Sequence, residues 1–243
     1  MATIAIYSLK GGVGKTSLAV NLAHAAARCR RRTLLWDLDP QAASSWLLSG
    51  DAPAAEPAEA VFARDIAPDR LIRTTAISGL DLLPADASLR GLDGFFSALG
   101  KRKRLLRLLE RLTGDYDRII LDCPPGLTET SEQVARAATL IVAPVIPSPL
   151  ARRAFDDVVR HFAGAPGRHA PILPVFSMVD RRRALHLSTI AAEPDWPIIP
   201  MASAVEQMAA RHLPVAAFAP ASPAAHAFAA IWTGIERRLA DAP

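Results

Sequence analysis

The sequence predicts an α/β fold in which helices cover both faces of a mostly parallel, doubly wound sheet. Short apolar runs recur along the chain, and stretches with helical spacing of apolar residues separate them. Runs that are apolar throughout are typical of strands buried on both faces, and their alternation with helices favours parallel pairing. At 243 residues, 51% of them hydrophobic, the chain can bury a substantial core, and we expect a single domain over residues 1–243.

Strands are expected where the apolar runs are short and end abruptly. In chain order they cover residues 4–7, 33–36, 80–84, 116–122, 140–145, 172–176 and 196–199. Helical spacing predicts a helix after the first strand, a long helix with the stripe Leu105, Leu108, Leu109 and Leu112, and a last helix with the apolar face Phe228, Ile231, Trp232, Ile235 and Leu239. Residues 51–60 are rich in alanine and proline without periodicity, so we expect an exposed connection there.

A glycine-rich loop joins the first strand to the first helix, and it reads Ser-Leu-Lys-Gly-Gly-Val-Gly-Lys-Thr-Ser over residues 8–17. Glycines let the backbone turn tightly against an anion, while N–H groups at the helix start point at phosphate oxygens. Lys15 is placed for the β- and γ-phosphates and the Thr16 hydroxyl for Mg²⁺. The pattern predicts a P-loop NTPase, whose phosphate-binding residues are Lys10, Gly11, Gly12, Val13, Gly14, Lys15, Thr16 and Ser17.

Three aspartates, Asp37, Asp39 and Asp122, stand at strand ends. Open α/β sheets bind ligands at the carboxyl ends of their strands, so we expect these carboxylates around the phosphates. Asp122 ends an apolar strand, and we expect it to hold Mg²⁺ through a coordinated water, opposite Thr16. Only one of Asp37 and Asp39 is expected to face the γ-phosphate directly.

Together these motifs resemble the ParA and MinD superfamily of ATPases. Leu9 stands where the strict P-loop pattern has glycine, and Lys10 opens the loop, as in the deviant motif of that superfamily. Residues 37–41 are similar to its switch I segment, and residues 121–126 are similar to its Walker B and switch II segment. The resemblance to ParA-type partition ATPases covers nearly the whole chain and implies ATP and Mg²⁺ as cofactors.

The resemblance also implies a role for each charged side chain. Asp39 orients or activates the attacking water, and Asp37 supports the metal site without binding the ion, unless it makes only a structural hydrogen bond to the loop. Lys15 serves the phosphates of its own subunit. Lys10 reaches into the active site of the other subunit, where it neutralises charge on the transferred phosphoryl. ATP then lies in a homodimer interface, so nucleotide state controls assembly.

Two later segments are similar to the base-binding parts of the family. Ser177 and Met178 lie in a strand that ends beside the adenine, and Pro200 and Met201 belong to a later loop on the base side. Family members often have arginine where Met201 stands, so the resemblance is incomplete there. The first strand begins at the third or fourth residue, which resembles the small form that lacks an N-terminal helix-turn-helix domain.

Basic residues provide candidates for nonspecific DNA contacts, which the resemblance implies. The net charge of +4 and the isoelectric point near 9.5 permit such contacts. The candidates are Arg181, Arg182, Arg183, Arg211, Arg237 and Arg238, with Lys103, Arg107 and Arg111 as another basic face. Each cluster is equally consistent with a solvated surface. We expect Arg30, Arg31 and Arg32 to cap the carboxyl end of the first helix.

The sequence therefore predicts a cytoplasmic, nucleoid-associated ATPase with weak intrinsic activity. It is expected to dimerise with ATP, to bind DNA in that state, and to position a plasmid, a chromosome or a protein complex until a ParB-like or other activating partner stimulates hydrolysis. No apolar run approaches the roughly 20 residues that cross a bilayer. Alternatives are a MinD-like membrane switch, a regulatory ATPase without DNA binding, and a reductase whose Cys29 and Cys123 hold an iron–sulfur cluster between subunits.

Overall fold

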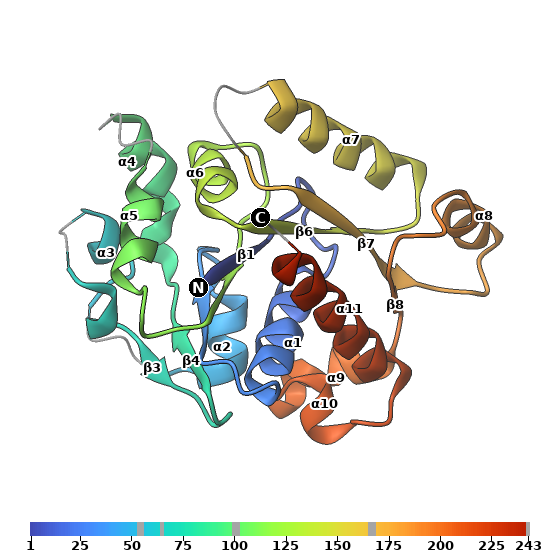
Figure 1. Cartoon of the computed structure of the whole chain (residues 1–243), viewed down its shortest axis with the longest axis horizontal. Helices are drawn as coiled ribbons and strands as arrows, with labels where there is room; N and C mark the ends of the chain where they lie inside the picture. Colours follow the sequence, from blue (N-terminus) through green and yellow to red (C-terminus); the bar gives the residue numbers. More distant parts are fainter. Residues whose placement is uncertain (53–55, 64–65, 99–102, 165–168, 242–243) are drawn as a thin grey trace.

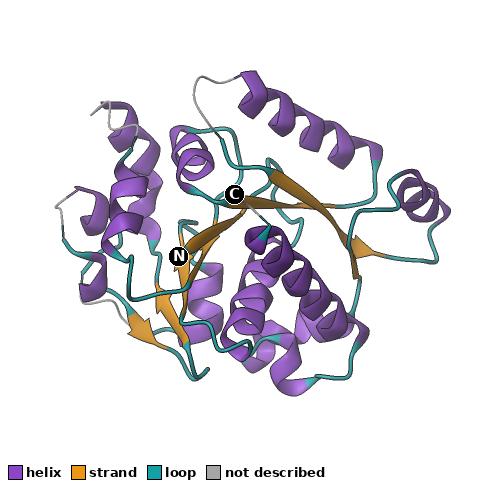
Figure 2. Ribbon diagram, viewed as in Figure 1, coloured by secondary structure: helices purple, strands orange, loops and turns teal. Residues whose placement is uncertain are grey.

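The computed structural model describes residues 1–52, 56–63, 66–98, 103–164 and 169–241, and it contains an eight-stranded sheet (Figures 1 and 2). The strand order is β3-β4-β2-β5-β1-β6-β7-β8, and every pairing is parallel except that of β3 with β4. The strands are β1 (Ala2–Ile6), β2 (Thr33–Asp37), β3 (Arg73–Thr74), β4 (Leu80–Leu83), β5 (Arg118–Asp122), β6 (Leu140–Val145), β7 (Ile172–Val179) and β8 (Ile198–Pro200). This confirms the predicted α/β class.

Helices cover both faces of the sheet (Figure 1). They are α1 (Lys15–Arg28), α2 (Ala43–Ser49), α3 (Ala60–Ala63), α4 (Leu92–Ala98), α5 (Arg104–Arg111), α6 (Glu129–Ala137), α7 (Pro149–Gly164), α8 (Ala184–Ala192), α9 (Ser203–Arg211), α10 (Val215–Phe218) and α11 (Pro223–Ala240), with the 3-10 helices η1 (Pro68–Arg70) and η2 (Ala87–Gly91). One core cluster packs α1, α9, α10 and α11 on the sheet, and the other packs α3 to α7 on it. None of the described helices combines the length and apolar character needed to cross a membrane.

The strands are apolar throughout because both of their faces are covered. Successive residues of a strand point to opposite faces, so Ile4 and Ile6 join the core cluster under α1 and α11, while Ala5 joins the other. The same alternation divides β5, where Ile120 packs on the α1 side and Ile119 on the α5 side. Full burial of these residues fixes the register of the central strands, since a slip by one residue would exchange the two faces.

Most predicted elements are present, with two corrections. The antiparallel strand β3 was not predicted, because two residues carry no periodicity that could reveal it. Residues 51–60 are not exposed along their whole length: Ala58 and Ala60 are buried, since Ala58 precedes α3 and Ala60 begins this buried helix, while residues 53–55 lie outside the described part. The stripe of Leu105, Leu108, Leu109 and Leu112 is buried as predicted.

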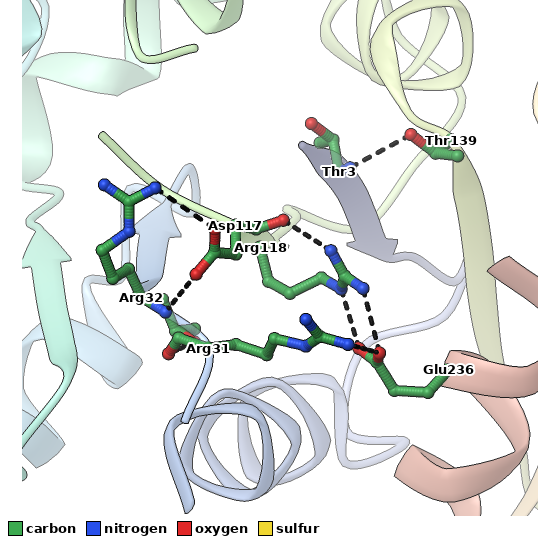
Figure 3. A network of polar contacts seen from close by, with 8 residues as sticks. Thr3, Arg31, Arg32, Asp117, Arg118, Thr139 and Glu236 are labelled. Atoms are coloured by element: carbon green, nitrogen blue, oxygen red, sulfur yellow. Dashed lines mark hydrogen bonds and ion pairs between the residues drawn. The ribbon is translucent and has the colours of Figure 1, made fainter. Parts of the chain in front are cut away.

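Charged residues at the amino ends of the strands form a closed network (Figure 3). The guanidinium of Arg118, at the start of β5, donates to both carboxylate oxygens of Glu236 at 2.7 and 2.9 Å, and Arg31 donates to Oε2 at 2.9 Å. Arg32 pairs with Asp117 at 3.2 Å. Arg30 and Arg31 also close the end of α1 as expected: Arg30 has φ +59°, its N–H donates to the carbonyl of Ala27 at 2.9 Å, and the N–H of Arg31 donates to that of Ala26 at 3.2 Å. The side chains of Arg31 and Arg32 meanwhile bind carboxylates of other elements.

Candidate functional site

The glycine-rich loop connects β1 to α1 through two residues with left-handed backbone. Gly12 has φ +69° and Gly14 has φ +87°, so any side chain at either position would be strained. Gly14 immediately precedes α1, and no side chain caps the helix, which leaves N–H groups of its first turn for an anion. A Cβ at Gly11 would meet nothing within 4 Å, so the loop faces open space there.

Lys15 lies inside this loop with its side chain buried. Its Nζ donates a hydrogen bond to the backbone carbonyl of Lys10 at 3.2 Å. Burial lowers the pKa of Lys15, and the charges of Asp122 and Asp39 oppose that shift. An amine held by a single carbonyl in a partly desolvated loop gains most from an anionic partner, which polyphosphate supplies.

Asp37 ends β2 and is fully buried. Its Oδ1 accepts the N–H of Asp39 at 3.0 Å, and its Oδ2 accepts the N–H and the hydroxyl of Ser45 at 3.0 and 2.7 Å. Burial raises the pKa of Asp37, while the hydrogen bonds from Ser45 and Asp39 lower it. Both oxygens are engaged by switch I and α2, and neither hydrogen-bonds the glycine-rich loop, so the arrangement suits support of the site rather than direct metal binding.

Asp122 ends β5 directly opposite Asp37 in the parallel register. Both of its carboxylate oxygens are buried without a hydrogen-bond partner. Burial, followed by the charge of Asp37, raises the pKa of Asp122 to about 8. An orphaned buried carboxylate needs a cation or a donor, and Mg²⁺ fits this need.

The residues of this site suit a magnesium ion that a bound nucleotide also coordinates. No group of three or more histidine, cysteine, aspartate or glutamate side chains within the described ranges could hold a metal by itself. Magnesium in nucleotide sites typically takes one or two protein ligands and fills its coordination with phosphate oxygens and water. Thr16 and Asp122 would supply the protein side of such a site.

A cleft of 700 Å³ opens beside the loop. The described residues that line it are Gly11, Gly12, Gly14, Lys15, Thr16, Ser17, Asp39, Pro40, Gln41, Arg90, Pro124, Pro125 and Met178. It brings the loop together with the segments after β2 and β5, and Asp39 accepts the N–H of Gln41 at 2.9 Å at its rim. Sequence reasoning had not included Arg90, because an isolated arginine outside every motif gives no signal.

Lys10 is not among the described lining residues of this cleft. It lines a small cavity against β6 and α7 instead, together with Val13 and Phe155. Within the described part of the chain its amine has no ion-pair partner. The two lysines of the loop therefore line different cavities, Lys15 the cleft and Lys10 the small cavity.

A second, smaller cleft adjoins the first at the ends of β7 and β8. Its lining includes Ser177, Met178, Pro200 and Met201, the residues that the sequence suggested for adenine. Ser177 is buried and its hydroxyl has no partner among the residues that the structure describes, which leaves a polar atom for a ligand. Met178 has φ +54° where the pairing of β7 with β8 shifts register, and it lines both clefts. Glu206 also lines the second cleft, and no motif had indicated it.

The candidate DNA-binding arginines do not form one surface. Arg181, Arg182 and Arg183 follow the carboxyl end of β7, whereas Arg237 and Arg238 lie beside Glu236 near the amino ends of the strands. Arg182 is paired with Asp180 at 2.9 Å, and Arg211 stacks over Phe218.

The two cysteines lie in different surroundings. Cys123, which follows Asp122, is buried, and Cys29 is exposed just after the last residue of α1. The buried thiol cannot reach a cluster shared with a second subunit without exposing the strand end that carries Asp122.

Comparison with known proteins identifies relatives of the chain. A family model described as an AAA domain matches residues 1–164. The chromosome partitioning protein ParA of Caulobacter vibrioides is 31% identical over 207 residues, which cover 76% of this chain and 72% of that protein. This confirms the resemblance inferred from the motifs.

Solved structures share the fold over nearly the whole chain. A putative plasmid partition protein from Borrelia burgdorferi, bound to AMPPNP, has a TM-score of 0.84 at 20% identity and covers 98% of this chain and 99% of its own. Cobyrinic acid a,c-diamide synthase from Mycobacterium smegmatis, with an ATP analog and magnesium, has a TM-score of 0.82 at 24% identity. The alignment covers 99% of this chain and 96% of the synthase chain. Likeness at these identities concerns the fold.

Proposed function

Since the chain belongs to the ParA family of P-loop ATPases, we propose that it is a nucleotide-controlled positioning ATPase. In this proposal ATP and Mg²⁺ bind beside the glycine-rich loop and two subunits close around them. The dimer binds DNA without sequence preference and carries or positions a plasmid, a chromosome or a protein complex. A ParB-like or other activating partner stimulates hydrolysis, which releases the dimer.

The observation that carries the proposal is the position of Lys10. Its amine has no ion-pair partner among the described residues, and Lys10 lines a different cavity from the cleft, although it belongs to the loop that builds the cleft. An unpaired positive charge on a residue that does not line the phosphate cleft of its own subunit suits a site on another molecule. In a dimer, Lys10 would stabilise the charge that develops on the phosphoryl group of the opposite subunit.

Exposed apolar side chains support assembly at the same edge of the sheet. Most of the large apolar residues exposed in the described part lie at or after the carboxyl ends of β5 to β8; they are Leu127, Leu150, Met178, Leu185, Leu187 and Met201. Leu150 is 70% exposed, and Met178 also lines the nucleotide cleft. Apolar surface gathered at one edge is typical of an interaction face, and its continuity with the cleft favours a nucleotide-dependent one.

The chain's own residues divide the work of hydrolysis. Thr16 and Asp122 would hold Mg²⁺, which when bound polarises phosphate oxygens and offsets their charge. Lys15 binds the phosphates together with the N–H groups of the first turn of α1. Asp39 lies at the cleft rim, where it can orient the attacking water, and Asp37 fixes that segment through the N–H of Asp39.

DNA contact is best assigned to Arg181 and Arg183. They lie next to the proposed dimer face, and neither has an ion-pair partner in the described ranges, unlike Arg182. In a dimer that joins the carboxyl edges, the arginines of two subunits would lie on one surface. Nonspecific binding to phosphates then depends on the assembled state and weakens steeply with salt.

A DNA titration tests the proposal. Wild type and Lys10→Ala are titrated with DNA in ATP, in ADP and without nucleotide, at low and at moderate salt. We expect ATP-selective binding that Lys10→Ala weakens greatly and that Arg181→Ala with Arg183→Ala removes. The matched control, Arg237→Ala with Arg238→Ala, leaves binding unchanged. Equal binding in all three nucleotide states would contradict the proposal.

A further inference from the structure

Arg90 lines the nucleotide cleft from an element that none of the recognised motifs includes. It is exposed in η2, the short helix that follows β4, and faces the same cleft as Lys15 and Asp39. No residue in the described ranges forms a hydrogen bond or an ion pair with its guanidinium. An unpaired guanidinium at the mouth of a phosphate cleft is a ready partner for an anionic ligand.

The backbone around Arg90 is held firmly in place. Asp86 caps the start of η2 by accepting the N–H of Ser88 at 2.8 Å, and its other oxygen accepts the N–H of Ala58 at 2.9 Å. Leu89 and Leu92, on either side of Arg90, are buried. Because the neighbouring residues are anchored in the core, Arg90 is held at the lining of the cleft by a segment packed on the core rather than by a loose loop.

The same segment is tied to the helix that follows switch II. Asp93, at the start of α4, accepts the N–H and the hydroxyl of Thr130 in α6 at 2.9 and 2.6 Å. Pro124 and Pro125, which precede α6, line the same cleft as Arg90. A ligand that contacts Arg90 therefore touches an element that is hydrogen-bonded to the switch II helix.

The charges of the cleft explain why a second cation is useful. Its charged lining residues are Lys15, Asp39 and Arg90, and Asp37 and Asp122 are buried just beneath. Without Arg90, one lysine would face a triphosphate beside three aspartates. Magnesium offsets part of this negative charge, and a guanidinium offsets more while its planar fork donates hydrogen bonds to two phosphate oxygens.

The strand order indicates which phosphate Arg90 meets. The smaller cleft suggested for adenine lies at β7 and β8, the glycine-rich loop follows β1, and Arg90 follows β4 beyond β5 and β2. A nucleotide with its base at β7 and β8 directs its phosphate chain toward β2 and β4. The terminal phosphate is then the part closest to η2.

We propose that Arg90 binds the γ-phosphate of ATP within its own subunit and thereby distinguishes ATP from ADP. This inference rests on the proposed function, because it uses the same nucleotide site. It adds a phosphate contact from η2 to those made by the loop, and it links the presence of the γ-phosphate to α4 and the switch II helix.

The test compares affinities for MgATP and MgADP, measured by titration calorimetry with a slowly hydrolysed ATP analogue, for wild type, Arg90→Gln and Arg90→Lys. Light scattering identifies a protein concentration at which the sample is monomeric. We expect Arg90→Gln to weaken MgATP-analogue binding by about tenfold or more and to change MgADP binding by less than about twofold. The affinity of Arg90→Lys for the MgATP analogue should lie between those of wild type and Arg90→Gln, because lysine keeps the charge but not the planar fork of donors.

The matched control is Arg70→Ala, since Arg70 is the last residue of the other 3-10 helix and is exposed away from the cleft. It should bind both nucleotides as wild type does. Wild-type affinity of Arg90→Gln for the ATP analogue would overturn the inference, and so would an equal loss for ATP and ADP, or a loss seen only in dimeric samples. Failure of wild type itself to bind MgATP would instead contradict the proposed function.

Discussion

The two edges of the central sheet, one at the amino ends and one at the carboxyl ends of its strands, differ in whether their charged side chains are paired. At the amino ends of the strands, Glu236 accepts from Arg118 and Arg31, and Asp117 accepts from Arg32, so each carboxylate has a cationic partner (Figure 3). At the carboxyl ends, Asp122 is buried with both oxygens unpartnered beside Asp37. One edge is complete in the protein alone, and the other requires a ligand.

This difference indicates that the charges of the amino edge stabilise the fold, whereas those of the carboxyl edge serve ligand binding. Paired charges at the amino edge stabilise the packing of α11 against β5. Unpaired charges at the carboxyl edge cost stability in the absence of ligand, since burial and like-charge repulsion disfavour ionised carboxylates. Removal of a carboxylate charge should therefore lower the free energy of unfolding at the amino edge and raise it at the carboxyl edge. The following predictions test that contrast in order of expected size.

The largest effect is expected for Lys15→Ala. Lys15 is a buried cation that lines the cleft, and its removal takes away the positive charge that offsets the aspartates and the phosphates. ATP hydrolysis should fall by about a hundredfold or more, measured as phosphate release in single turnover. The folded structure should persist, because within the described part of the chain Nζ makes a single hydrogen bond, to the Lys10 carbonyl. Undiminished hydrolysis would show that the cleft is not where ATP reacts.

Asp122→Asn should separate activity from stability. The variant should lose magnesium-dependent hydrolysis, because an amide is a poor substitute for a carboxylate ligand. In EDTA at neutral pH its free energy of unfolding should rise by about 1 kcal/mol or more, since it relieves a buried carboxylate whose pKa is raised to about 8. Urea titration measures this change.

Asp117→Asn is the matched control for Asp122→Asn, because Asp117 lies just before β5 and Asp122 ends it. It should keep hydrolysis and gain no stability. If both variants were destabilised alike, the contrast between the edges would be wrong.

Glu236→Gln should destabilise the protein without affecting hydrolysis. Partial burial raises the pKa of Glu236, but Arg118 and Arg31 outweigh it and hold the pKa below 4.5. A depressed pKa contributes stability that is present above 4.5 and is lost as the pH falls through the folded-state value. After allowance for partial exposure, the loss at neutral pH should be about 1 kcal/mol. Urea titrations at several pH values should show the two proteins converging in acid.

The smallest effect is expected for Arg32→Ala. Its pair with Asp117 is largely exposed, with 59% of the arginine side chain accessible, so solvent and salt screen it. The change in Tm should be well below that for Glu236→Gln and should vanish in high salt. A larger change than for Glu236→Gln would reverse the ranking within the amino edge.

The sequence was sufficient to predict the core of the fold because that part is periodic. Central strands are apolar throughout, and the stripe from Leu105 to Leu112 is helical in spacing. β3 was missed because it is two residues long, and the burial of Ala58 and Ala60 was missed because alanine is compatible with either environment. Such details depend on tertiary contacts that local pattern does not contain.

The site shows the same limit. The glycine-rich loop and the strand-end aspartates could be predicted because each motif is local. Arg90 and Glu206 could not, since they reach the clefts only through the order of strands in the sheet. The partners of Arg31 and Arg32 were likewise hidden, because they lie 205 and 85 residues away along the chain.

The central claim, that Lys10 completes the site of a second subunit, is tested most directly by mixing two inactive variants. Lys10→Ala keeps an intact cleft but has no lysine to donate, and Asp39→Ala keeps Lys10 but has a defective cleft. A mixed dimer contains one complete site if Lys10 acts across the interface, so an equimolar mixture should regain about a quarter of wild-type ATP hydrolysis. A mixture as inactive as either variant alone would contradict the account.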